Sequence, residues 1–541
     1  MNKYREIKLI YGAVVIIFAA FLVLPIGSLL IQSFYHNGSL TLSNYLQTYQ
    51  TTGFMETLQN SFVVSGVSAL VTVILAFIIA YTINYTRMFK GLKRVINNVS
   101  MLPMLLPTIT YGFAIIYSFG KQGLWTKAFG FQLFDIYGFK GLMLGYVIYT
   151  LPIAFMLINN AMGYIDKKFV IVSKLMEDSS YKTLMITLIR PLLPTLAAAF
   201  IQAFFLSFTD FGIPASVGGK YDVVASVLYN KMLGSVPNFA SGAVVAMTML
   251  IPSVVSIGLL HYLEKYNIRY NKISTIEIKP NRVRDICWGT LSTLINVVII
   301  AIFAVIIIVP FIGEWPYRIN FTFQNVINVF NDTALLGVIK NSLIIAICSA
   351  IVGTMVVYGA ALATARSTLN PKLKKIIDSI ALATNTIPGM VLGIAYLLMF
   401  SGSPLQNTYL IIILCNIVHF FSSPYLMMKN SLTKMNGSFE TTAKLMGDSW
   451  FKTIIRVITP NAISSILEVF SYYFINAMVT VSAVIFIAGA RTMVITTKIK
   501  ELQHFAKFNE IFVLSILILL INLLAKGLFS YLSKQKKKGK Q

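Results

Sequence analysis

The side chains that carry most enzyme chemistry are few in this sequence of 541 residues. The histidines are scattered and the cysteines lie unpaired in apolar stretches: His36, His261, His419, His504, Cys287, Cys348 and Cys415. Nucleophilic catalysis, a zinc site or a disulfide framework needs such residues in matched clusters. The Gly-Lys pairs at 120, 219 and 539 lack the P-loop spacing and its following Ser or Thr. We therefore expect no catalytic site, no metal site and no cofactor in this chain.

The composition indicates a membrane protein. Hydrophobic residues make up 57% of the chain and charged residues only 12%, whereas soluble domains carry about 25% charge. Lys and Arg number 44 against 19 acidic residues, for a net charge of +25. Such a balance often indicates nucleic-acid binding, but here the basic residues gather between apolar blocks, so we expect a lipid partner and no nucleic acid.

Apolar blocks long enough to cross a bilayer, which takes about 20 residues, recur along the chain. The fold class predicted is an all-α integral membrane protein with twelve spans. The block from Ser379 to Met428 is too long for one helix, and Ser401–Pro404 divides it as a turn would. The other blocks are 9–34, 57–86, 95–120, 141–165, 191–209, 232–263, 286–313, 341–365, 469–490 and 511–525.

The basic residues predict the orientation. If the N-terminus is cytoplasmic, the inside segments hold 32 of the 44 Lys and Arg residues. Basic residues prefer the cytoplasmic side of a membrane. We therefore expect both termini inside.

A segment between spans occurs twice. Lys174–Leu184 recurs 270 residues later as Lys444–Ile454. The sequence therefore predicts two parallel six-span halves, 1–263 and 286–541, joined by a cytoplasmic linker at 264–285. Parallel repeats of this kind occur in transporters.

The repeated segment is too polar to span but carries apolar residues at helical spacing: Leu445, Met446, Trp450, Ile454, Val457 and Ile458. Gly447 interrupts the pattern, and Asp448 and Ser449 can cap the helix that follows. Asp178 and Ser179 are their counterparts in the first half. The pattern predicts two short helices joined by a sharp bend, suited to a groove on another protein. A single amphipathic helix of this kind would more often lie on the bilayer, but the duplication favours the groove.

The second copy resembles the EAA loop of type I ABC-transporter permeases. The resemblance rests on Glu440–Gly447, including Thr441 and Ala443, with Pro460 thirteen residues after Gly447. In the first copy Glu177 stands where the family has glycine, and Pro191 falls one place late. The resemblance implies two fused permease domains with cores at about 57–262 and 338–533, in a bacterial cell membrane. It also implies a separate cytoplasmic ATPase dimer, contacted by these coupling loops, and an extracytoplasmic solute-binding protein.

Two further segments resemble one branch of these permeases. Thr209–Pro214 with Gly218–Val223, and Trp315–Tyr317, resemble 2-aminoethylphosphonate permeases more than others. The resemblance therefore implies 2-aminoethylphosphonate as the solute, with ferric iron or thiamine as the alternative.

Two acidic residues in or near spans are candidates for the transport pathway. Asp210 follows the fifth span, where it could line the outer mouth or cap a turn. Glu468 lies in the eleventh span, where pairing with a Lys or Arg competes with contact to solute. Pro107 with Gly112, and Pro388 with Gly393, are predicted to loosen the third span of each half or to kink it for packing.

A secondary transporter is the alternative from another class, because it also uses repeated halves. That class predicts ion-coupling acids inside the membrane and leaves the duplicated cytoplasmic segments unexplained. A channel fits less well, since no filter-like repeat is present.

The predicted topology can be tested with reporter fusions. A fusion after Gln541 and one within residues 35–55 should report opposite sides of the membrane, because the basic asymmetry places these points on different faces. If both fusions report the same side, the topology is wrong.

Overall fold

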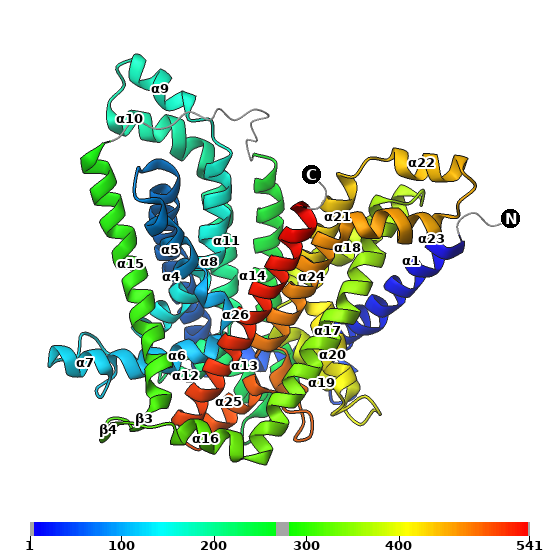
Figure 1. Ribbon diagram of the computed structural model, residues 1–541. Coiled ribbons are helices and arrows are strands. Elements are labelled where there is room, and N and C mark those ends of the chain that lie inside the picture. Colours follow the sequence, from blue (N-terminus) through cyan, green and yellow to red (C-terminus); the bar gives the residue numbers. More distant parts are fainter. Residues whose placement is uncertain (1–4, 267–280, 539–541) are drawn as a thin grey trace. The chain divides into compact units, whose positions relative to one another are not determined.

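The computed structural model describes residues 5–266 and 281–538, which are almost entirely helical (Figure 1). These residues form two compact units. Unit 1 comprises 1–48, 231–250 and 326–541, and unit 2 comprises 49–230 and 251–325. Each unit is described by itself.

Unit 2 is built around long helices connected by short helices and one hairpin. Its elements are α4 (Phe54–Tyr85), α5 (Lys90–Ser100), a 3-10 turn (Leu102–Leu105), α6 (Thr108–Phe119), α7 (Leu124–Phe129), α8 (Phe139–Gly163), α9 (Lys168–Leu175), α10 (Ser180–Leu184), a π-helical turn (Met185–Ile189), α11 (Arg190–Thr209), α12 (Gly212–Val217), α13 (Val224–Leu233), α15 (Arg282–Ile308), a 3-10 turn (Val309–Phe311), β3 (Ile312–Glu314) and β4 (Arg318–Phe321). The last three residues of α13 and the first half of α14 (Phe239–Glu264) belong to unit 1.

Unit 1 has a similar succession of elements. They are α1 (Arg5–Phe18), a π-helical turn (Ala19–Val23), α2 (Leu24–Phe34), β1 (Tyr35–His36), β2 (Ser39–Leu40), α3 (Ser43–Gln50), α16 (Gln324–Asn331), α17 (Thr333–Ala365), α18 (Pro371–Thr386), α19 (Gly389–Phe400), α20 (Tyr409–His419), α21 (Ser422–Thr433), α22 (Ser438–Leu445), α23 (Trp450–Thr453), a π-helical turn (Ile454–Ile458), α24 (Thr459–Val479), a 3-10 turn (Val484–Phe486), α25 (Ile495–His504) and α26 (Phe508–Lys538). Both hairpins, β1–β2 and β3–β4, are antiparallel.

The first span of each half packs on helices of the other half. In unit 1, α1 packs on α17 and α2 on α19, and the Tyr396 hydroxyl donates to the Phe21 carbonyl at 2.6 Å. In unit 2, α15 packs on α4 and α6, where the hydroxyls of Thr82 and Ser292 lie 2.6 Å apart. The compact units therefore differ from the two sequence halves. The domain boundaries at 263 and 286 describe the sequence repeat and stay a prediction, and most of the linker falls outside the described residues.

The structure confirms an all-α membrane fold but not the count of twelve spans. Within residues 5–266 and 281–538, nine helices are long and apolar enough to cross a membrane, or up to eleven if two bent pairs each count as one span. One bent pair is α18 with α19, at 101°, and the other is α20 with α21, at 58°. The span expected at 95–120 is divided between α5, a 3-10 turn and α6.

The third span of each half breaks at its proline. Pro107 is the N-cap of α6, and Pro388 is the N-cap of α19. The glycine five residues later in each copy allows a close approach. A Cβ on Gly112 would lie 1.6 Å from Ser216 Oγ, and one on Gly393 would lie 2.4 Å from the Ala483 carbonyl oxygen. The prolines thus interrupt the third span, and the glycines make room for the segment that follows the fifth span.

Replacing Gly112 by Ala should destabilise the protein. Its Cβ would also lie 2.4 Å from Ser216 Cβ, so a rotamer change of Ser216 cannot relieve the overlap, and overpacking typically costs about 1–3 kcal/mol. The measurement is thermal unfolding in detergent. Gly66→Ala is the control, because no atom lies within 4 Å of its Cβ position. Equal melting temperatures for both variants would contradict the close approach.

Candidate functional site

The first copy of the repeated segment is a bend between two short helices. Glu177 follows the end of α9 with a positive φ of 56°. The Asp178 N–H donates to the Ser173 carbonyl at 3.1 Å, which is the six-to-one bond of a helix end with a left-handed residue. Ser179 then caps α10, because its side chain accepts from the Lys182 N–H at 3.3 Å.

The second copy has the same geometry. Gly447 has a φ of 79°, and the Asp448 N–H donates to the Ala443 carbonyl at 2.9 Å. The Ser449 side chain accepts from the Lys452 N–H at 3.2 Å and caps α23. The predicted pair of short helices with a sharp bend is therefore present in both halves. A π-helical turn follows each copy before the fifth span of the half begins.

The two copies stabilise this bend differently. A non-glycine residue in the left-handed region costs roughly 1–2 kcal/mol, which applies to Glu177 and not to Gly447. In the first copy the Ser173 hydroxyl donates to Asp178 Oδ2 at 2.7 Å and lies 2.9 Å from Thr183 Oγ1. Ala443 takes the place of Ser173 in the second copy and offers no hydroxyl. The added hydrogen bonds thus offset the missing glycine.

The charges around the first bend support it further. Lys182 Nζ lies 2.6 Å from Asp178 Oδ1. Hydrogen bonds from Lys182 and Ser173 hold the pKa of the Asp178 carboxyl below its usual value. In the second copy Lys452 pairs with Asp448 in the same way.

Each bend exposes a Leu-Met pair at its tip. The exposed fractions are 79% for Leu175, 71% for Met176, 84% for Leu445 and 77% for Met446. The other predicted apolar anchors behave differently, since Ile454 and Ile458 are buried within the chain and Trp450 is half-buried. The helix leading into the fifth span thus packs Ile454 and Ile458 on its own bundle, which leaves Leu445 and Met446 as the most exposed of the six apolar residues.

The remaining residues expected in the coupling loops lie on these elements. Thr441 is exposed on α22, and Pro460 occupies the first turn of α24, as Pro191 does in α11. Lys174 belongs to α9, but its side chain falls outside the described residues.

The two acidic pathway candidates are far apart in the sequence and lie in different units. Asp210 is buried at the end of α11 and accepts from the Ile213 N–H at 2.9 Å, as well as from Thr108 and the Gly212 N–H. It therefore caps the start of α12. Glu468 is exposed on α24 and accepts from the Ser533 hydroxyl at 3.3 Å. A pathway role for either residue stays a prediction.

A pair of Asn-Ser dipeptides, which the sequence analysis did not single out, holds the start of a short helix in each unit, α13 in unit 2 and α25 in unit 1. The Ser61 hydroxyl accepts from the Val224 N–H at 2.8 Å, and the Ser342 hydroxyl accepts from the Ile495 N–H at 2.8 Å. Asn60 donates to the Asp222 carbonyl, and Asn341 to the Met493 carbonyl. The sequence could have indicated these residues, because Asn60-Ser61 and Asn341-Ser342 occupy matching places in the two halves.

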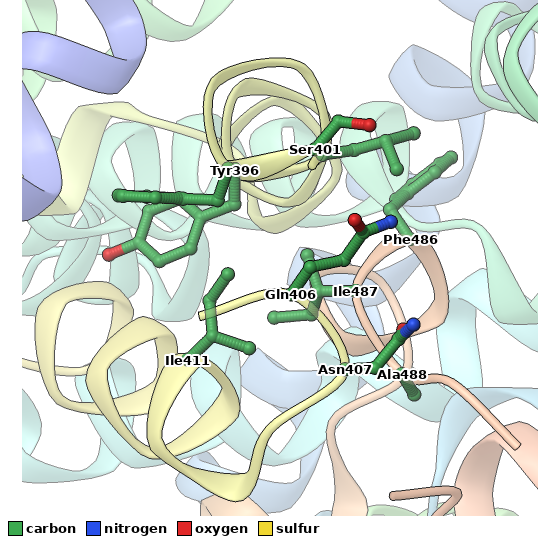
Figure 2. Close-up of a pocket in the computed structure, with 10 residues that line it drawn as sticks. Tyr396, Ser401, Gln406, Asn407, Ile411, Phe486, Ile487 and Ala488 are labelled. Carbon is green, nitrogen blue, oxygen red and sulfur yellow. The ribbon is translucent and has the colours of Figure 1, made fainter. Parts of the chain in front are cut away.

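A small hollow of about 40 Å³ in unit 1 was not predicted either. It lies between the end of α19, the start of α20 and the turn at 484–488. Figure 2 shows the Tyr396 hydroxyl pointing away from the Gln406 amide, in keeping with its bond to Phe21. The lining residues are Tyr396, Leu397, Phe400, Ser401, Gln406, Asn407, Ile411, Phe486, Ile487 and Ala488.

Removing the Ser173 hydroxyl should loosen the first bend. Ser173→Ala should raise amide hydrogen exchange across residues 174–184 by roughly tenfold, because a hydrogen bond to a charged group contributes about 1.5–3 kcal/mol. Exchange would be followed by mass spectrometry. Ser438→Ala, at the exposed start of α22, is the control. Unchanged exchange at 174–184 would show that Glu177 holds its conformation without this network.

Comparison with known proteins places these features in a family. The sequence matches the model of binding-protein-dependent transport system inner membrane components over residues 72–267 and 355–538. It is 24% identical over 502 residues to a ferric transport system permease protein, FbpB 1, of Haemophilus influenzae, covering 89% of this chain and 78% of that protein. It is also 24% identical over 513 residues to FbpB of Actinobacillus pleuropneumoniae, covering 91% of this chain and 74% of that protein.

A solved bacterial ABC transporter that imports the acidic polysaccharide alginate contains a chain similar to part of this one. The identity is 13% and the TM-score 0.43, with 48% of this chain and 97% of that chain covered. The family model itself matches in two places that correspond to the two sequence halves. With most of its length matched, this chain belongs to the family of binding-protein-dependent transport system inner membrane components, as a fused two-domain permease of the type I ABC importers.

Proposed function

We propose that the two bent segments dock onto a cytoplasmic ATPase dimer that powers import. The observation that carries the proposal is the shared bend in both halves, each with an exposed Leu-Met pair at its tip. Short helices with protruding apolar residues suit a groove on a partner protein. One segment in each half would match one groove in each ATPase subunit. ATP hydrolysis then belongs to that separate subunit, and this chain supplies the membrane passage.

The proposed setting is a bacterial cell membrane with both termini and both bent segments on the cytoplasmic side. The basic asymmetry of the sequence supports this orientation. A solute-binding protein on the opposite side would deliver the cargo. The secondary-transporter alternative is set aside, because the family to which the chain belongs is that of binding-protein-dependent transport systems.

For the cargo, we infer that ferric iron is delivered by the binding protein. Support comes from the two FbpB relatives, each of which is similar to about nine-tenths of this chain. The runner-up is 2-aminoethylphosphonate, which rests on the segments at 209–223 and 315–317. Their side chains have internal roles that require no solute, since Asp210 caps α12 and the Trp315 indole donates to the Gln122 carbonyl at 2.7 Å. No observation favours thiamine.

Deletion of the gene would test the cargo. Loss of ferric-iron uptake with intact growth on 2-aminoethylphosphonate as sole phosphorus source is the expected result. Radiolabelled iron uptake and growth on the phosphonate are the two measurements. The control is the deletion strain carrying the intact gene on a plasmid. The opposite pattern would overturn the ferric assignment and leave the permease assignment standing.

Gly447→Glu should uncouple ATP hydrolysis from transport. No atom of this chain lies within 4 Å of the Cβ position of Gly447, so the permease should still fold and insert. The change adds roughly 1–2 kcal/mol of backbone strain. It also places a charged side chain beside the exposed pair Leu445 and Met446. ATPase activity and transport would be measured on the reconstituted complex.

Glu177→Gly provides the matched comparison in the first segment. It removes the strained residue and leaves the Ser173 network intact, so transport should stay near that of the unaltered protein. Equal loss of transport in Gly447→Glu and Glu177→Gly would count against unequal bends.

A further inference from the structure

Arg366, at the end of α17, contacts several parts of the second bent segment. Its guanidinium lies 2.5 Å from Glu440 Oε2 on α22. The same group donates to the Met435 carbonyl at 2.9 Å and to the Asn436 carbonyl at 3.0 Å, in the turn before α22. Its own carbonyl accepts from the Trp450 indole of α23 at 3.4 Å. One residue thus joins α17 to the turn and to both short helices.

This ion pair is largely shielded from water. The side chains of Arg366 and Glu440 are 6% and 25% exposed. Removing one partner from such a pair leaves an uncompensated charge in a site of low polarity, which is strongly unfavourable. The rigid guanidinium also fixes the direction of its hydrogen bonds. The pair therefore restrains the position of α22 relative to α17.

A second ion pair lies near the same end of α17. Asp378 Oδ1, on α18, lies 2.5 Å from Lys429 Nζ and accepts from the Tyr425 hydroxyl at 2.7 Å. The Tyr425 hydroxyl also lies 3.0 Å from Thr364 Oγ1, close to Arg366. These contacts connect the end of α17 to α18 and α21. They therefore also restrain Arg366, which lies at that end of α17.

The first half has other residues at the matching places. Lys93 Nζ donates to the Thr86 carbonyl as Lys374 Nζ does to the Ser367 carbonyl. This correspondence places Tyr85 at the position of Arg366. The repeated segment aligns Val170 with Glu440, and Ser180 with Trp450.

The first segment therefore cannot form the same anchor. Tyr85 and Val170 carry no charges to form an ion pair, and Ser180 offers no indole. Lys167 Nζ lies 5.7 Å from the centre of the Tyr85 ring, which is a weaker contact than a shielded ion pair. Within the first segment, the network of Ser173 and Asp178 described above supports the bend.

We propose that Arg366 is a positioning residue that fixes the second bent segment to α17 through an ion pair that the matching residues of the first segment do not form. Movement of the ATPase at the second segment then reaches α17 through Arg366. The mechanical part of this inference rests on the proposed function. The restraint by Arg366 is a property of this chain alone.

The restraint can be measured on the full chain in lipid nanodiscs, without an ATPase. Spin labels at Met355 and Leu445 report the second segment, and labels at Ile74 and Leu175 report the first. All four positions are exposed and the two pairs match in the repeat. The three native cysteines are replaced by Ser beforehand. Electron–electron double resonance gives the distance distribution of each pair.

Arg366→Gln should broaden the Met355–Leu445 distribution and leave Ile74–Leu175 unchanged. Arg456→Gln, an exposed arginine just after α23, is the control and should change neither. A Met355–Leu445 distribution that Arg366→Gln does not broaden would overturn the positioning role.

A second experiment separates positioning from folding. Arg366→Gln should lower transport per ATP severalfold in the reconstituted complex, while the ATPase still co-purifies with the permease. Exchanging the charges, with Arg366→Glu and Glu440→Arg together, should restore part of the transport that either single change loses. Absence of any recovery, or transport by Arg366→Gln equal to that of Arg456→Gln, would overturn the mechanical role. If no ATPase binds even the unaltered chain, the proposed function fails while the distance measurement still decides the restraint.

Discussion

The structure depends on one constraint, which is that backbone N–H and C=O groups have no water to bind inside a bilayer. Long helices meet the constraint within themselves, as α4 and α17 do over 32 and 33 residues. Wherever the chain leaves a helix in the buried part of the bundle, a side chain or a neighbouring segment must supply the missing partner. Ser61 and Ser342 do so for the N–H groups of Val224 and Ile495, and Asp210 does so at the start of α12.

The same constraint explains why the breaks in the third spans are tightly packed. Proline removes a donor and ends the helix, which leaves carbonyls without partners on the preceding turn. In unit 2 the Tyr111 hydroxyl donates to the Leu106 carbonyl at 3.0 Å. Gly112 and Gly393 then allow the segment after the fifth span to approach the broken helix closely. These breaks create a helix end within the bundle that the neighbouring segment covers.

The two bent segments show that one geometry can have different supports. Gly447 adopts the left-handed conformation without steric cost. Glu177 adopts the same conformation at a steric cost, next to a hydrogen bond from the Ser173 hydroxyl to Asp178. The second copy lacks this hydrogen bond because Ala443 stands at the place of Ser173. The second segment is anchored outside itself, through Arg366 and Glu440. Duplication therefore preserved the bend and the exposed Leu-Met tips, while the attachment to the bundle diverged.

The sequence by itself determined the class of the protein, because hydropathy and charge placement are properties of composition and spacing. It also determined the repeat and the bend, since Asp448-Ser449 and the residues around Gly447 act over a few neighbouring positions. Even the proline positions indicated where the third spans weaken, although not that they break into separate helices.

Only the tertiary structure decided the features that join distant parts of the chain. Three such features join residues 74 or more positions apart. They are the packing of α1–α2 and of α15 on helices of the opposite half, the pairing of Arg366 with Glu440, and the approach of Ser216 to Gly112. The count of twelve spans was not confirmed for the same reason, since whether two bent helices form one span depends on how they pack. Local patterns carry no information on which distant groups meet, because those contacts depend on how whole helices pack.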